Sequence, residues 1–132
     1  MQNKTEFSLD VRWGDMDAIG HVNNAVYLSY YESARMDWFE KRGTMRCFDG
    51  STVPVIVQAN CSYRVAVVYP CKLNVTTELQ KVGNTSFTFK QTLLDRDSGI
   101  LYSELVTTCV WIDSVSNKSL PVPEFIRQLL AE

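Results

Sequence analysis

One segment of the sequence limits the fold more than any other: a single long stretch of helical character in the first third of the chain. The helix is expected over residues 25–42 (AVYLSYYESARMDWFEKR), with Asn23 or Asn24 as its N-cap. A short side-chain oxygen at that position can accept from the unpaired N–H groups of the first turn. Gly43 suits the left-handed position just past a helix end, and Lys41 and Arg42 complement the helix dipole there. The rest of the fold must therefore be built around this one helix.

Most of the remaining sequence has strand patterns. Before the helix, Phe7, Leu9, Val11 and Trp13 alternate with polar residues, which is the period of a strand with one buried face. After the helix, strand-type runs are separated by short turn sequences, as in an antiparallel meander. These runs cover residues 53–57, 58–63, 72–82, 85–94 and 101–112, and a short C-terminal helix is expected over residues 124–131 (EFIRQLLA). One early strand, one long helix and four or more later strands predict an α+β fold in which the sheet covers the helix.

The size and charge of the chain limit the classes of function that it can have. The 132 residues are enough for one domain, so residues 1–132 are predicted to form a single one. The 13 Lys and Arg against 15 Asp and Glu give a net charge of −2, so we expect no nucleic-acid partner. No stretch approaches the roughly 20 apolar residues of a membrane helix, which predicts a soluble protein without a membrane partner. Four cysteines without CxxC spacing, and no signal-peptide pattern, indicate the cytoplasm.

The densest polar segment lies between the first strand and the helix, at residues 13–24 (WGDMDAIGHVNN). It contains two carboxylates, Asp15 and Asp17, and the only histidine of the chain, His21, next to the expected helix N-terminus. First-turn N–H groups and the helix dipole can stabilise a developing oxyanion while a carboxylate acts as base or nucleophile. Gly20 suits a loop whose backbone approaches a substrate. The segment is therefore compatible with acyl transfer that uses neither metal nor cofactor.

Two other interpretations of this segment stay open from the residues alone. Asp, Gly and Asn are ordinary residues of loops and helix caps, so the segment is equally compatible with a simple connection. Asp15, Asp17 and His21 also have a spacing that can offer metal ligands, but the set is small, and one histidine cannot build a multi-histidine zinc site. We predict no metal site.

The contiguous run WGDMDAIGHVNNAVYLSYYESAR resembles the hallmark segment of hotdog-fold acyl-CoA thioesterases of the 4-hydroxybenzoyl-CoA thioesterase type. Its HVNN portion is also similar to plant acyl-carrier-protein thioesterases. The resemblance extends over nearly the whole chain and implies a hotdog fold, a long central helix wrapped by an antiparallel sheet of five or six strands. It further implies hydrolysis of an acyl-CoA thioester to free acid and coenzyme A, with no cofactor, since coenzyme A is part of the substrate.

Carried over residue by residue, the resemblance implies that Asp17 is the catalytic carboxylate, which attacks the thioester carbonyl or activates a water. It implies an oxyanion-binding backbone N–H around Asn23 and Asn24. His21 has two equally weighted roles, polarising the carbonyl or water, or orienting the adjacent asparagine backbone. The plant enzymes carry an asparagine two residues after the aspartate, where this chain has Ile19. That departure favours the simpler bacterial arrangement over an Asp-Asn-His triad.

Substrate contacts are expected from five residues. Tyr27 and Tyr31 on the helix can line an acyl tunnel, although an aromatic helix face is more often core. Arg64 and Lys72 can meet the phosphates of coenzyme A, and Gly20 allows close backbone approach. The resemblance implies a homodimer or homotetramer in which edge strands pair across subunits. The alternative is a non-catalytic hotdog protein that binds an acyl thioester or an aromatic ligand.

Overall fold

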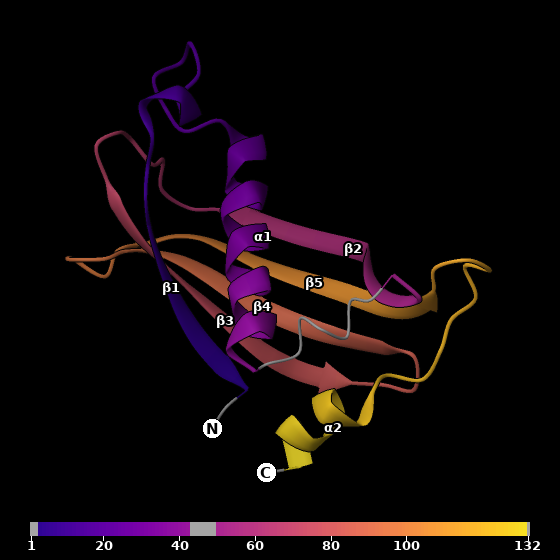
Figure 1. Cartoon of the computed structure of the whole chain (residues 1–132). Coiled ribbons are helices and arrows are strands. Elements are labelled where there is room, and N and C mark those ends of the chain that lie inside the picture. Colours follow the sequence, from indigo (N-terminus) through magenta and orange to yellow (C-terminus); the bar gives the residue numbers. More distant parts are fainter. Residues whose placement is uncertain (1–2, 43–49, 132) are drawn as a thin grey trace.

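The computed structural model describes residues 3–42 and 50–131. Figure 1 shows a long helix lying across one face of a sheet, with a short helix at one end. The elements in chain order are β1 (Lys4–Asp10), the 3₁₀ turn η1 (Trp13–Asp15), α1 (Asn24–Lys41), β2 (Thr52–Tyr63), β3 (Lys72–Val82), β4 (Ser86–Asp95), β5 (Leu101–Asp113) and α2 (Glu124–Ala131). Within the described ranges, neither helix is long and apolar enough to span a bilayer.

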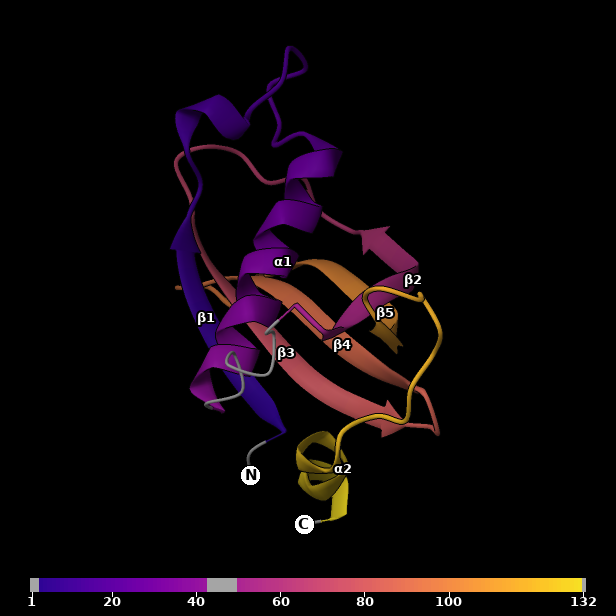
Figure 2. The same ribbon diagram turned by 45° about the vertical axis from the view of Figure 1, so that its right-hand side comes forward.

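The sheet has five strands in the order β1-β3-β4-β5-β2, and every neighbouring pair is antiparallel. β1 and β2 flank α1 in sequence but lie at opposite edges of the sheet. The chain must therefore cross the sheet between them, and α1 makes this crossing over one face, as Figure 1 and Figure 2 show. This topology brings the N-terminus of α1 next to the end of β2, where the Tyr63 hydroxyl donates to the Asn24 carbonyl at 3.2 Å.

The core lies between α1 and the sheet in two clusters. Tyr27, Tyr30, Tyr31 and Ala34 on the first half of α1 pack into one cluster with residues of β3, β4 and β5. The second half contributes to an aromatic cluster that α2 also contacts; its buried members include Trp38, Phe39, Phe87, Phe89, Trp111 and Ile126. The buried positions of α1 recur three or four residues apart, which places them on one side of the helix.

The helix agrees with the sequence prediction. It begins at Asn24, and the side chain of Asn23 caps it by accepting from the Ala25 amide at 2.9 Å. The last helical residue is Lys41, and Gly43, the predicted stop position, lies outside the described residues.

Two strand predictions need correction. The runs 53–57 and 58–63 form one strand, β2, whose register against β5 shifts between Ile56 and Gln58 at a bulge. The extra residue, Val57, breaks the alternation that a sequence reader follows. Trp13 is not on a buried strand face but 75% exposed in η1, because the partner of β1 begins at Lys72 and pairing stops at Asp10.

Candidate active site

The polar segment between β1 and α1 folds into a compact loop. The Asp17 amide donates to the His21 carbonyl at 3.0 Å, and the Gly20 amide donates to the Asp17 carbonyl at 3.0 Å. Gly20 has a φ of +90°, a conformation that L side chains rarely adopt, so glycine is required here for a backbone reason. Met16 and Val22 form an isolated antiparallel bridge across the base of the loop. The loop thereby fixes Asp17 close to the start of α1.

The first carboxylate of the loop, Asp15, has a structural environment. It is 5% exposed and accepts from the Tyr30 hydroxyl at 2.6 Å and from the Arg12 amide at 2.9 Å. The Arg12 guanidinium adds an ion pair at 3.2 Å. Burial acts to raise the pKa of Asp15, but these hydrogen bonds and the Arg12 charge together hold it below its ordinary value. Asp15 is therefore an ionised carboxylate that connects the loop to α1 through its hydrogen bond with Tyr30, and both of its oxygens already have partners.

Asp17 is half-buried, and its carboxylate has two hydrogen-bond donors in the described chain. One oxygen, Oδ1, accepts from the Ile19 amide at 2.9 Å. The other, Oδ2, accepts from the side-chain amide of Asn23 at 3.4 Å, and the same asparagine caps α1 through its oxygen. Asn23 therefore links the orientation of Asp17 to the first turn of the helix.

The amides of the first turn are not equally available. The Asn23 amide donates to the Asp15 carbonyl at 3.0 Å, and the Ala25 amide is taken by the Asn23 side chain. The Asn24 amide has no acceptor among residues 3–42 and 50–131. Of the two amides expected from the sequence, Asn24 is therefore the one that can receive an external oxygen.

Beside this amide lies an open cleft of about 250 Å³. It is lined by His21, Val22, Asn24, Tyr27, Tyr63, Arg64, Val65 and Ala66. The Tyr27 hydroxyl accepts from the Val67 amide at 3.3 Å, and its ring packs edge-on against Tyr63 at 4.9 Å. Four of the residues that the sequence singled out, His21, Asn24, Tyr27 and Arg64, thus meet at one cleft.

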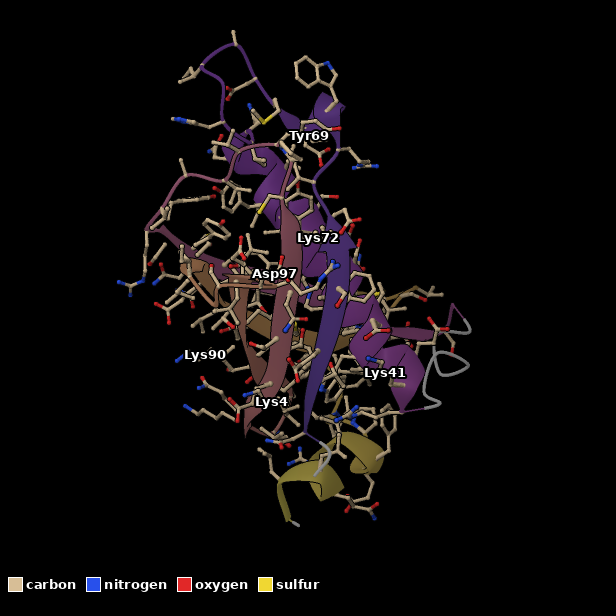
Figure 3. The ribbon with its side chains drawn as sticks, turned by 90° about the vertical axis from the view of Figure 1, so that its left-hand side faces the viewer. Lys4, Lys41, Tyr69, Lys72, Lys90 and Asp97 are labelled. Atoms are coloured by element: carbon tan, nitrogen blue, oxygen red, sulfur yellow. The ribbon has the colours of Figure 1, made fainter. Side chains whose placement is uncertain are left out.

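Three of the five predicted substrate contacts do not line this cleft: Gly20, which precedes His21 in the loop, Tyr31 and Lys72. Tyr31 is fully buried in the core, where its hydroxyl donates to Ser103 Oγ at 2.8 Å and burial raises its pKa. Lys72 is exposed at the start of β3, on the side of the molecule shown in Figure 3. Its neighbour Leu73 is fully buried beneath α1, and side chains alternate along a strand, so Lys72 points to the opposite face of the sheet.

Arg64 lines the cleft, but its guanidinium is already engaged. Its Nη2 lies 2.5 Å from Glu104 Oε1, and its Nε donates to the same oxygen at 2.9 Å. Lys90 approaches the other Glu104 oxygen at 3.9 Å. A phosphate at the cleft mouth would therefore have to compete with Glu104 for Arg64.

Sequence reasoning missed Tyr63, Val65 and Ala66. They come from the end of β2 and the segment after it, about forty positions from the helix start that they face. Tyr63 carries a weak signal, since it is an aromatic residue at the end of a predicted strand. Nothing local to the sequence shows that this strand end meets the N-terminus of α1.

A family model described as the Thioesterase-like superfamily matches residues 11–130 of the chain. The chain belongs to the thioesterase-like superfamily. The match includes the loop, the cap of α1 and the whole cleft, and it confirms the resemblance found in the sequence.

Individual relatives of this thioesterase-like chain agree with that assignment. The long-chain acyl-CoA thioesterase FadM of Escherichia coli (strain K12) is 29% identical over 125 residues, which cover 94% of this chain and 95% of FadM. The solved structure of the PA2801 protein of Pseudomonas aeruginosa is 35% identical, with a TM-score of 0.87 and coverage of 95% and 96%. Slr0204, a 1,4-dihydroxy-2-naphthoyl-CoA thioesterase from Synechocystis, is 17% identical with a TM-score of 0.88, covers 98% and 96%, and supports the fold alone. These likenesses confirm the predicted hotdog fold.

Proposed function

We propose that this chain hydrolyses acyl-CoA thioesters to a free acid and coenzyme A. Asp17 is the catalytic carboxylate, and the backbone amide of Asn24 is the oxyanion donor. The observation that carries the proposal is a half-buried carboxylate that contacts the N-cap residue Asn23, one position before a helix N-terminal amide that has no acceptor in the described chain. Membership of the thioesterase-like superfamily and likeness to an acyl-CoA thioesterase support the choice of substrate class.

The chemistry needs few groups. With the thioester carbonyl oxygen at the Asn24 amide, charge that develops on this oxygen is stabilised by the N–H and by the helix dipole. A carboxylate oxygen of Asp17 then attacks the carbonyl carbon, the C–S bond breaks, and water hydrolyses the resulting anhydride. In the second route, Asp17 removes a proton from a water that attacks the carbonyl carbon, and the thiolate leaves in the same way. Both routes release free acid and coenzyme A thiol.

His21 is proposed to act from the cleft wall. His21 lines the cleft, and its backbone carbonyl accepts from the Asp17 amide. A polarising role depends on the ring, whereas an orienting role depends only on the backbone. Replacing His21 with Asn keeps a polar group of similar reach and removes the imidazole, so a loss of activity in His21→Asn with an unchanged fold favours the polarising role.

A homodimer or homotetramer and a cytoplasmic location also belong to this proposal. β2 is an edge strand, and its Ile56 and Val57 are 47% and 59% exposed. An exposed apolar edge is a template for pairing with another chain. Cys61, Cys71 and Cys109 are free thiols, as expected in a reducing compartment, and Cys47 lies outside the described residues. Light scattering of the purified protein measures the assembly.

The test is release of free thiol from short-chain, long-chain and aromatic acyl-CoAs by the wild type and by Asp17→Asn. Hydrolysis by the wild type, with a loss of at least about 100-fold in kcat for the variant, supports the proposal. If neither protein releases thiol above background while an acyl-CoA still binds, the chain is the non-catalytic binding protein. If Asp17→Asn is as active as the wild type, Asp17 is not the catalytic carboxylate.

A further inference from the structure

Tyr63, the last residue of β2, contacts the first turn of α1 from outside the helix (Figure 2). Its hydroxyl donates to the Asn24 carbonyl at 3.2 Å, and its ring packs edge-on against Tyr27. The hydroxyl must be the donor, since a carbonyl oxygen only accepts. Partial burial raises the pKa of Tyr63 to about 12, so the phenol is protonated at neutral pH. Because Tyr63 pairs with Ser103 of β5, the sheet rather than α1 sets the position of this donor.

The peptide group that accepts from Tyr63 also donates on its other side. The Asn24 carbonyl and the Ala25 amide belong to one planar, conjugated peptide group. The Ala25 amide donates to Asn23 Oδ1 at 2.9 Å, and Asn23 Nδ2 donates to Asp17 Oδ2 at 3.4 Å. This orientation of the asparagine amide is required, because its oxygen faces a backbone donor and its nitrogen faces a carboxylate acceptor. Tyr63, this peptide group, Asn23 and Asp17 therefore form one linear hydrogen-bond network.

Every donor in this network points in the same direction, from Tyr63 toward the carboxylate of Asp17. A hydrogen bond to the oxygen of an amide polarises its N–H, so each bond in such a series strengthens the next by about 10–30%. The series ends on a charged group, and hydrogen bonds to charged groups are the stronger ones. Removing the hydroxyl at the start of the network should therefore weaken the bond at its end.

The bond between Asn23 and Asp17 is the longest in the network and the most easily lost. At 3.4 Å it exceeds the usual range for N–H···O bonds, about 2.7–3.2 Å. Asp17 Oδ1 has a closer donor in the Ile19 amide, at 2.9 Å, so Oδ2 is the oxygen that depends on Asn23. A small displacement of the first turn of α1 would break the Oδ2 contact and let the carboxylate rotate. Tyr63 restrains that turn from the side of the sheet.

We propose that Tyr63 is a positioning residue that holds Asp17 Oδ2 in place through the 24–25 peptide group and Asn23. This inference rests on the proposed thioester hydrolysis and adds to it a residue from β2. Tyr63 also lines the cleft, so the competing role is a direct contact with the substrate. The two roles differ in what they predict: a positioning residue affects kcat through Asn23, whereas a residue that binds the substrate uniformly affects KM.

The kinetic test is a double-mutant cycle of Tyr63→Phe and Asn23→Ser, measured by thiol release from acyl-CoA. Tyr63→Phe keeps the ring and deletes only the hydroxyl. Alone, it should lower kcat by about fivefold at unchanged KM, a factor typical of one neutral hydrogen bond. Combined with Asn23→Ser, which removes the bond to Asp17, it should change kcat by less than about twofold. Equal losses of kcat in both backgrounds, or a higher KM at constant kcat, overturn the proposal.

Tyr69→Phe is the matched control. Tyr69 is 40% exposed, close to the 46% of Tyr63, and its ring also packs edge-on against another aromatic residue, Trp13. Among the described residues, its hydroxyl has no hydrogen-bond partner. The control should therefore release thiol at the wild-type rate. A loss as large as that of Tyr63→Phe would show that the hydrogen bond to Asn24 is not the cause, and would overturn the assignment.

Amide NMR signals of the same variants test the network without hydrolysis. Weaker hydrogen bonds move amide protons to lower chemical shift, so Tyr63→Phe should move the signals of the Ala25 backbone amide and the Asn23 side-chain amide. The Val67 amide, which donates to Tyr27, should stay in place, because the Tyr63 ring that packs on Tyr27 is kept. A shift of Val67 as large as that of Ala25 would mean that the hydroxyl acts on the packing of the whole cleft, which contradicts the proposal.

The two measurements separate this inference from the proposed function. If the Ala25 and Asn23 signals move but the wild type hydrolyses no acyl-CoA, the network stands and the proposed function fails. If acyl-CoA is hydrolysed but neither signal moves in Tyr63→Phe, the function stands and the role of Tyr63 fails.

Discussion

The side chain of Asn23 donates to Asp17 Oδ2 at 3.4 Å while its own oxygen accepts from the Ala25 amide at 2.9 Å. One asparagine thereby caps α1 and orients the proposed catalytic carboxylate. The helix cap and the orientation of Asp17 therefore depend on the same side chain, so a substitution of Asn23 is expected to affect both.

Substitution of Asn23 separates these two roles. Asn23→Ala removes both, so we expect a loss of about 0.5–2 kcal/mol in the free energy of unfolding, together with reduced kcat. Asn23→Ser keeps a capping oxygen but is too short to replace the contact with Asp17. It should retain most of the stability and still lose activity. Urea unfolding and thiol release measure the two effects, and a fully active Asn23→Ala would show that Asp17 needs no orientation by Asn23.

Asp15 predicts an acid-dependent loss of stability. Burial opposes its ionisation, but hydrogen bonds from Tyr30 and Arg12 outweigh burial and lower its pKa below the ordinary 3.8. The contribution of such a group is fully present above the unfolded-state pKa, and it is lost as the pH falls through the lower folded-state pKa. We therefore expect this part of the stability to be constant near neutral pH and to decline below about pH 4.

The Tyr30→Phe variant tests this account. It deletes one hydrogen bond to a buried carboxylate and should lower the free energy of unfolding at pH 7 by about 1–3 kcal/mol. Asp15→Asn should flatten the acid limb of the stability curve, whereas replacement of the exposed Asp97 with Asn should not. Denaturant titrations from neutral to acidic pH provide the measurement. An unchanged acid limb in Asp15→Asn would contradict the assignment.

Gly20 and Gly14 form a matched pair within the loop. An added Cβ meets nothing within 4 Å at either position, but only Gly20 has a positive φ. Gly20→Ala should therefore cost about 1–2 kcal/mol through backbone strain and should lower kcat by displacing Asp17. Gly14→Ala should be nearly neutral in both respects. Equal effects of the two substitutions on unfolding and thiol release would mean that backbone conformation is not what requires Gly20.

Trp38 and Trp13 differ in burial despite being the same residue type. Trp38 is fully buried and packs on Phe39 and Phe89, so Trp38→Ala should lower the free energy of unfolding by about 3–5 kcal/mol. Trp13 is 75% exposed and contacts Tyr69 edge-on, so Trp13→Ala should cost less than about 1.5 kcal/mol. Thermal or urea unfolding compares them. A large loss for Trp13→Ala would restore the strand position predicted from the sequence.

Local signals in the sequence were sufficient to predict the helix, most strands and the polar loop. The Asn23 cap and the turns after β3 and β4 depend on residues within a few positions of one another. The same is true of the contact between Asp17 and Asn23. Short-range hydrogen bonds and side-chain periodicity depend on residues that are close together in the sequence, so they can be predicted from the sequence alone.

The sequence by itself determined the elements and the polar loop, and the resemblance in that loop singled out Asp17. Only the tertiary structure decided that the Asp15 carboxylate is hydrogen-bonded to Tyr30, that the Asn24 amide has no acceptor in the described chain, and that Tyr63 lines the cleft. It likewise decided that Arg64 is held by Glu104 and that Arg35 meets Gln91. These pairs are separated by 40 and 56 positions: Arg64 meets Glu104 because β2 pairs with β5, and Arg35 meets Gln91 because α1 packs across the sheet. Both contacts depend on how distant elements pair and pack, which no local pattern encodes.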